Sequence, residues 1–271
     1  MSSNSALQPV NERGWRSGFA NLLRNENLEW WGSRRWLTQA GLWLLILNGM
    51  VTLVMFVTPA VMQVTQDDNA GAMDPISMGI PAFFQMGATA LAIGTVILVQ
   101  GEVVGERQSG ITEWILSKPV ARPAYFLAKM VAHSIGIFAV MIGFQSTVTY
   151  GLFWLANGDP LPLLPFLVGV GGLTLHTFFY LTLTLVLGVF AKTRRQVLGV
   201  AMGSLFGGML LLNIIGRLGL ITPWSLPNIL PALVIQIPLP FATAFMPILM
   251  TAIWSIGFIA AALWKLSRLE F

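Results

Sequence analysis

The sequence predicts an all-α, polytopic membrane protein with six transmembrane helices, an amphipathic N-terminal interfacial helix and an outer re-entrant segment before the last span. Three observations support this fold class: low charge, long apolar stretches and alternating basic segments. Of the 271 residues, 55% are hydrophobic and 10% are charged, and the mean hydropathy is +0.74. A soluble domain has about 25% charged residues, so this chain has too little polar surface to face water.

Six stretches are long enough to cross the hydrocarbon core, which takes about 20 apolar residues in a helix. They are residues 37–58, 80–100, 125–154, 163–191, 197–216 and 243–264. Residues 1–36 are polar and charged, and they lack the apolar core and cleavage site expected of a signal peptide. We therefore predict a cytoplasmic N-terminal segment, 1–36, and a six-span transmembrane domain, 37–271.

Basic residues predict the orientation, because cytoplasmic loops are enriched in Lys and Arg. One set of alternate segments contains Arg13, Arg16, Arg24, Arg34, Arg35, Arg107, Lys118, Arg122, Lys129, Lys192, Arg194, Arg195, Lys265 and Arg268. The other set contains Arg217 alone, with Asp67, Asp68, Asp74 and Asp159. Both termini are therefore expected in the cytoplasm. Topology also explains the positive net charge without a nucleic-acid partner.

The N-terminal segment has the pattern of a helix that lies in the headgroup region. Two sets of side chains fall at helical spacings on different sides, the apolar Trp15, Phe19, Leu22 and Trp30 and the polar Arg13, Arg16, Arg24 and Asn27. We expect the indoles at the membrane boundary and the arginines near anionic lipid. Such a helix is either a simple anchor or a connecting helix that also touches a cytoplasmic partner.

The apolar segment 217–242 is not predicted to be a seventh span. It contains Pro223, Pro227, Pro231, Pro238 and Pro240. These prolines remove backbone donors and interrupt a long helix. A seventh crossing would also move the basic C-terminal tail to the wrong side. We expect short helices or a re-entrant cap on the outer side, shielded by protein.

Residues 101–129, which we call the connector, concentrate both signs of charge between two apolar spans. The charged residues are Glu102, Glu106, Arg107, Glu113, Lys118, Arg122 and Lys129. Glu102 and Glu106 are one turn apart, so we expect their carboxylates to share a face exposed to the cytoplasm. Gly110 predicts a break between two short helices, and Pro119 predicts their end. The connector is either a docking surface for a soluble partner or an ordinary solvated loop.

The sequence GERQSGITEWILSKPVARPAYFLAKM resembles the loop between spans two and three of type-2 ABC (ATP-binding cassette) exporter permeases. That family shows an acidic residue, Gly, Ser-x-Pro-x-x-Arg, an aromatic residue and a Lys that opens the next span. The matching positions are Glu106, Gly110, Ser117, Pro119, Arg122, Tyr125 and Lys129. The six-span plan and the short basic tail are similar too. Compact permeases such as that of the nitrous oxide reductase maturation system look most similar.

This resemblance implies the permease subunit of an ABC exporter in the inner (plasma) membrane of a prokaryote. It implies a homodimer, two copies of a separate ATPase that holds ATP and Mg, and room for accessory proteins. Residues 101–124 would form the coupling loop. The expected ATPase contacts are Glu102, Glu106, Arg107, Gly110, Glu113, Ser117, Pro119 and Arg122. The chain has no G-x-x-x-x-G-K-[ST] motif, so no bound cofactor is expected.

Within the spans, glycines and polar residues mark candidate functional positions. Gly199, Gly203 and Gly207 lie four residues apart, which indicates either ordinary close packing or a homodimer seam. His133, near the cytoplasmic boundary, is expected to hydrogen-bond locally. The candidate pathway residues are His176, Gln85, Asn48 and Asn213, which could equally hold helices together.

The chain is not expected to be an enzyme or a metal protein. It has no Cys and only two His, which disfavours a zinc centre, and no carboxylate lies mid-span beside His176. The rival to a transporter permease is a membrane anchor or assembly subunit that docks soluble partners and transports nothing. The substrate is not identified by the sequence.

Overall fold

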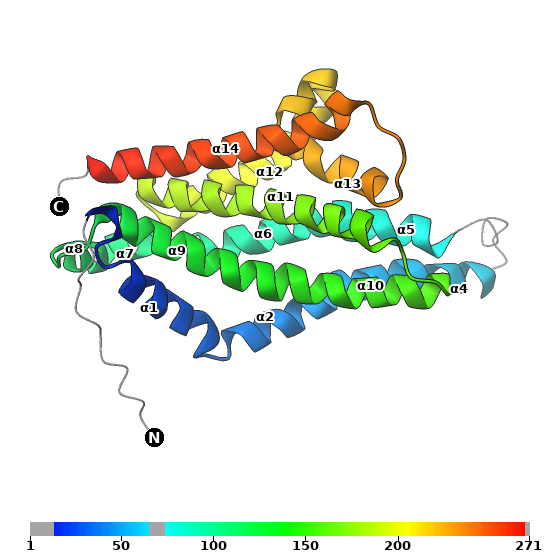
Figure 1. The fold of residues 1–271 in the computed structure, drawn as a ribbon, viewed down its shortest axis with the longest axis horizontal. Coiled ribbons are helices and arrows are strands. Elements are labelled where there is room, and N and C mark those ends of the chain that lie inside the picture. The colour runs from blue at the N-terminus through cyan, green and yellow to red at the C-terminus, as the bar shows by residue number, and fades with distance from the viewer. Residues whose placement is uncertain (1–13, 65–73, 269–271) are drawn as a thin grey trace.

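A computed structural model describes residues 14–64 and 74–268 as an elongated bundle of helices (Figure 1). No β-strand occurs in these two ranges. The helices are α1 Phe19–Trp31, α2 Arg35–Trp43, α3 Gly49–Thr52, α4 Thr58–Val64, α5 Pro75–Pro81, α6 Gly87–Val99, α7 Val104–Gln108, α8 Ile111–Leu116, α9 Arg122–Gly136, α10 Phe144–Asn157, α11 Leu163–Phe190, α12 Arg194–Ile215, α13 Leu226–Val234 and α14 Phe241–Ser267.

The predicted number of spans is confirmed. Six continuous helical stretches are long and apolar enough to cross a membrane: Arg35–Met62, Pro75–Gln108, Arg122–Asn157, Leu163–Phe190, Arg194–Ile215 and Phe241–Ser267. Each includes one predicted span or all but its last residue. The chain is therefore an all-α polytopic membrane protein.

The first three spans differ from the last three in their backbone. Wide π-helical turns interrupt the first three spans at Leu44–Asn48, Leu53–Val57, Ala82–Met86 and Ile137–Gly143. The later spans α11, α12 and α14 are α-helical along their whole lengths. In a π-turn the backbone N–H of residue i donates to the carbonyl of residue i−5 instead of i−4, and such turns often lie at functional positions.

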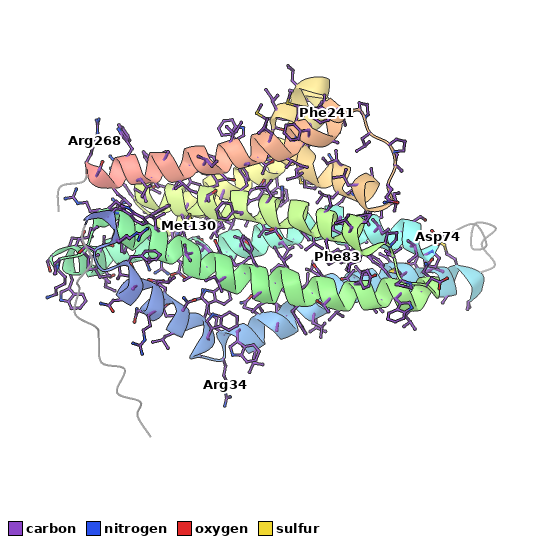
Figure 2. All side chains as sticks on the ribbon, in the orientation of Figure 1. Arg34, Asp74, Phe83, Met130, Phe241 and Arg268 are labelled. Carbon is purple, nitrogen blue, oxygen red and sulfur yellow. The ribbon has the colours of Figure 1, made fainter. Side chains whose placement is uncertain are left out.

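The bundle packs around α11, which lies against α6, α12, α13 and α14. Apolar side chains fill the interior, and Phe83 lies inside the bundle in Figure 2. Asp74 and Arg268 lie near opposite ends of the bundle in the same view. The connector and the end of α14 share one end, which we call the connector end. The half that holds α13 is called the α13 half (Figure 1).

The proline-rich segment before the last span folds into short helices, as predicted. It contains 3-10 turns at Gly216–Ile221 and Pro223–Ser225, followed by α13. Leu230 and Val234 of α13 pack directly onto Gly172 and Gly169 of α11, where a Cβ would collide with them. Helix α13 therefore packs back onto α11, whereas residues 235–238 after it are exposed.

Helix α1 follows the predicted N-terminal helix, but it packs on protein. It lies along α9, and Trp30 is fully buried where a Cβ on Gly136 would occupy the space of the indole. The expectation that Trp30 lies at the membrane boundary is therefore wrong. Trp15 remains 52% exposed. The predicted polar position Arg13 lies outside the described residues, as do Asp67 and Asp68.

Candidate functional site: the connector and its ionic network

The connector has the predicted arrangement of two short helices separated by a glycine. Helix α7 ends at Gln108, and Gly110 has φ 75°, a left-handed conformation that favours glycine. Helix α8 follows directly. Helix α9 then starts at Arg122, with Pro123 in its first turn, where a missing N–H costs nothing. The connector is thus a compact folded unit at one end of the bundle.

Glu106 points inward and is bonded on both carboxylate oxygens. The Tyr125 hydroxyl donates to Oε2 at 2.7 Å, and Lys129 Nζ donates to Oε1 at 2.8 Å. Lys129 also donates to Glu26 Oε1 of α1 at 2.7 Å, and its own side chain is only 2% exposed. A buried ammonium needs such partners, because an unpaired buried charge is strongly destabilising.

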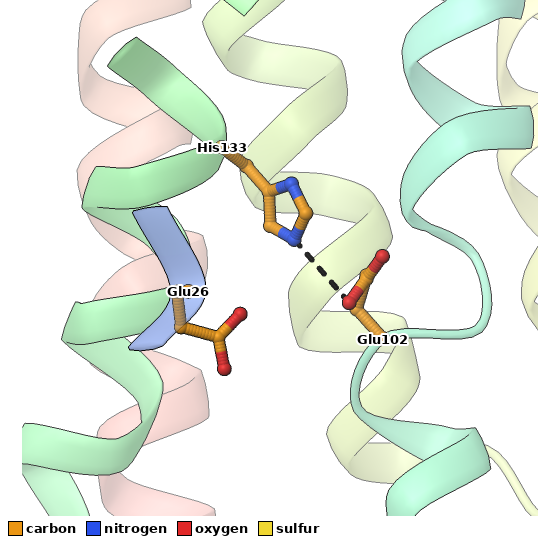
Figure 3. Close-up of side chains that lie close together, drawn as sticks. All are labelled: Glu26, Glu102 and His133. Atoms are coloured by element: carbon orange, nitrogen blue, oxygen red, sulfur yellow. Dashed lines mark ion pairs between the residues drawn. The ribbon is translucent and has the colours of Figure 1, made fainter. Parts of the chain in front are cut away.

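Glu102 makes the second half of this network. Its carboxylate lies 3.3 Å from Arg35 Nη2. It also lies 3.4 Å from His133 Nε2, the ion pair drawn in Figure 3. Trp30 Nε1 donates to His133 Nδ1 at 3.1 Å. His133 therefore joins α1, α9 and the start of the connector. We call Glu26, Arg35, Glu102, Glu106, Lys129 and His133 the ionic network.

These contacts overturn the expected exposure of the two carboxylates. The side chains of Glu102 and Glu106 are 17% and 23% exposed and face the protein rather than the cytoplasm. The one-turn spacing was correctly interpreted as a shared face, but α1 and α9 cover that face. The predicted role of Glu102 and Glu106 as contacts for a partner stays a prediction.

The ionic network includes three side chains that could approach one metal ion. Ligand atoms of Glu26, Glu102 and His133 all lie within 4.8 Å of one another (Figure 3). Because Trp30 donates to Nδ1, a neutral His133 carries its proton on Nε2, the atom that faces Glu102. The Lys129 ammonium already donates to the Glu26 carboxylate. The donor set therefore suits internal ion pairs better than a metal.

Burial sets the protonation behaviour of Glu26 in α1. Loss of hydration on burial raises the pKa of its carboxyl above the usual 4.5, and the nearby Lys129 ammonium opposes this shift without cancelling it. The pair remains in contact at 2.7 Å. Burial thus favours the neutral carboxylic acid form of Glu26, whereas the contact with Lys129 favours its carboxylate form.

Two arginines fasten the connector to the ends of other spans. Arg107 Nη1 donates to the carbonyls of Gly188, Val189 and Ala191 at 3.3, 2.6 and 3.4 Å, at the C-terminus of α11. Arg122 Nη1 donates to Leu266 and Ser267 at 3.2 and 3.0 Å, at the C-terminus of α14. The last carbonyls of a helix lack intrahelical partners and attract cations. The connector is therefore bonded to two further spans.

The remaining predicted contacts lie at the free surface of the connector. Gly110, Glu113, Ser117 and Pro119 are exposed. Trp114, which is not among the predicted contacts, is 64% exposed on α8, and Lys118 Nζ lies 5.2 Å from the centre of its ring. An aromatic residue among charges in a short cytoplasmic helix was the signal that could have identified it.

Three of the four candidate pathway residues come together. His176, Gln85 and Asn213 line a cavity of about 360 Å³ in the α13 half. Asn48 does not line it. Asn48 donates to Gln145 Oε1 and accepts from Thr149, both at 2.8 Å, in a buried cluster between the first and third spans. Asn48 thus acts in helix packing in this structure.

The glycines of α12 present an open surface. A Cβ on Gly199, Gly203 or Gly207 would meet no other atom within 4 Å, whereas one on Gly208 would collide with Trp224. The three-glycine stripe therefore faces away from the protomer, in keeping with a surface available to another helix. Whether that helix belongs to a second copy stays a prediction.

The family profile described as ABC-2 family transporter protein matches residues 33–270. This match spans most of the chain, so the chain belongs to the ABC-2 family of transporter proteins and is a multi-pass permease subunit of an ABC transporter. Permeases of this family normally work with a separate ATP-binding subunit. No curated protein matches the chain.

Proposed function

We propose that the chain is the permease of an exporter and works as a homodimer with two copies of a separate ATPase. It would lie in the plasma membrane of a prokaryote with both termini in the cytoplasm, as the distribution of Lys and Arg predicts. The proposed coupling between the ATPase and the permease is supported by a difference between two parts of the connector. Its base is bonded to α2, α9, α11 and α14, and its tip, α8, is exposed.

The exposed tip supplies a surface of the kind that soluble partners bind. Ile111 and Trp114 are 45% and 64% exposed, and Glu113 and Ser117 lie beside them on the surface. Exposed tryptophans dominate the energy of many interfaces, surrounded by polar residues that exclude water. We therefore place the main ATPase contact at Trp114, with Glu113, Ser117 and Lys118 around it.

The bonded base of the connector would pass a movement of α8 on to the spans. Displacement of α8 by the ATPase would act through Glu106 on α9 and through Glu102 on α2 and α9. The same displacement would act through Arg107 on α11 and through Arg122 on α14. Charge-assisted hydrogen bonds are short and directional, so these elements would shift together. The glycine stripe of α12 would form the seam between the two copies.

The experiment uses the permease reconstituted with its ATPase in nanodiscs. Trp114→Ala should lower co-purification of the ATPase, and the matched control Trp154→Ala, a 53% exposed tryptophan on α10, should not. The double change of Glu106→Gln and Arg107→Ala should keep the ATPase bound but abolish the effect of the permease on ATP hydrolysis. A permease that purifies without any ATPase would instead favour the membrane anchor.

A further inference from the structure

The cavity in the α13 half contains a buried polar atom without a partner. His176 is 2% exposed, and its Nδ1 makes no hydrogen bond to the described residues. The ring hydrogen-bonds the backbone of Pro223, which offers only a carbonyl because proline has no N–H. The other ring nitrogen therefore donates, and Nδ1 of the neutral imidazole is a free acceptor. An unmade hydrogen bond of this kind is costly in a buried site.

The rest of the cavity lining contains uncharged polar side chains and apolar side chains. Gln85, Thr89, Asn213 and Asn228 contribute amides and a hydroxyl. The apolar lining consists of Met86, Leu205, Met209, Leu212 and Pro227, together with the Trp224 ring, whose Nε1–H is a buried donor without a partner among the described residues. No charged side chain occurs among the described residues that line the cavity. Such a site suits a neutral ligand, because a charged one would be desolvated without a counter-ion.

The position of the cavity separates it from the predicted seam. Trp224 covers Gly208 on the inner face of α12, whereas Gly199, Gly203 and Gly207 face outward. The cavity and the glycine stripe therefore lie on different faces of one helix. A ligand in the cavity would contact α12 from within the protomer, and a second copy would contact it from outside.

We propose that this cavity binds a neutral amphiphile whose head carries hydroxyl or amide donors, with one donor bonded to His176 Nδ1. The apolar tail lies against Met209, Leu212 and Trp224. The proposal rests on the proposed function only where it treats this amphiphile as cargo. Binding itself requires the permease alone.

The test uses a photoactivatable alkyl glycerol ether with a diazirine in its alkyl chain, added to the permease in nanodiscs. Labelled peptides are identified by mass spectrometry. The first control probe is the dimethyl ether of the same compound, which keeps the oxygen acceptors but cannot donate. The second control probe is an alkyl carboxylate with the same chain. The diol should label peptides of the cavity about tenfold more than either control, as expected for one good hydrogen bond.

Variants then assign the effect to His176. His176→Leu should lower labelling by the diol about tenfold, and His176→Asn should retain most of it, because its amide oxygen remains an acceptor. Thr147→Val is the control, since Thr147 lines a different cavity, also of about 360 Å³, between α10 and α11. It should change nothing.

Equal labelling by the diol and its dimethyl ether in the wild-type protein would overturn the proposal, and this comparison does not depend on the folding of any variant. Undiminished labelling of His176→Leu would also overturn it. Neither result would affect the coupling experiment on Trp114. Conversely, a permease without an ATPase would leave this binding site intact and remove only its role in transport.

Discussion

The connector end and the α13 half surround their buried histidines with different groups. At the connector end, Lys129 is held by two carboxylates, and His133 lies between an indole N–H and a carboxylate. In the α13 half, no charged side chain lines the cavity beside His176, and Nδ1 of His176 has no hydrogen-bond partner among the described residues. The comparison indicates that one end fixes helices relative to one another, whereas the other leaves room and bonding capacity for a ligand.

The largest expected effect is at the centre of the ionic network. Lys129→Met leaves Glu26 and Glu106 buried beside each other without a cation, so the protein should lose about 3–5 kcal/mol of stability. Thermal unfolding in detergent micelles measures this loss. Lys118→Met, at an exposed position on the same connector, should change stability by less than about 0.5 kcal/mol. Equal melting temperatures for the two variants would contradict a stabilising network.

A smaller loss is expected where the connector meets α11. Arg107→Ala removes a charged donor from three carbonyls at the end of that helix, which should cost about 2 kcal/mol. Hydrogen exchange should rise at the last turn of α11 first. Arg195→Ala serves as the control, because Arg195 is exposed at the start of α12. No change in exchange at 187–191 would show that Arg107 does not hold this end.

The two histidines provide a direct comparison of the two ends. His133→Leu leaves the Trp30 N–H without its acceptor, so it should cost about 2 kcal/mol. His176→Leu takes the donor away from the Pro223 carbonyl but also removes the unbonded Nδ1, so its cost should be smaller, about 1 kcal/mol. Thermal unfolding of the two variants side by side tests the difference. A larger loss for His176→Leu would reverse our interpretation of the two ends.

The smallest effect depends on pH. The pKa of Glu26 is raised by burial, so the folded protein holds this proton more tightly than the unfolded chain. Protonated Glu26 therefore contributes to the free energy of unfolding below about pH 4.5. This contribution is lost as the pH rises through the pKa that Glu26 has in the folded protein. Glu26→Gln should remove that decline, so the melting temperature of the variant should rise relative to that of the wild type as the pH rises. Melting curves between pH 4 and 8 measure it, and parallel curves would count against the raised pKa.

Much of the fold followed from local sequence features. Apolar length defined six spans, Gly110 marked the break in the connector, and closely spaced prolines marked the segment around α13. The partners of the connector could not be predicted, because Glu26 and Lys129 are 103 residues apart. Helical spacing showed that Glu102 and Glu106 share a face, but only the packing of α1 on α9 decided which face is covered.

The same limit applied to the candidate pathway. Polar groups are costly inside a membrane, which points to His176, Gln85 and Asn213, and three different spans bring these residues to one cavity. Asn48 was selected on the same ground and instead bonds Gln145 and Thr149. Polarity identifies positions under constraint, but it does not distinguish a ligand-binding group from one that joins helices.

The π-turns distinguish the first three spans of the chain from the last three in how their backbones can deform. At Ile137–Gly143 the backbone pattern is widened, and the Gln145 amide supplies a bond to the Val140 carbonyl at 3.2 Å. A helix with such a turn can shift its twist by exchanging a few local bonds, whereas an unbroken helix such as α11 must move as a rod. We therefore expect the first three spans to change their twist more readily than α11 and α12, whereas α14 contains Pro247 and can bend there.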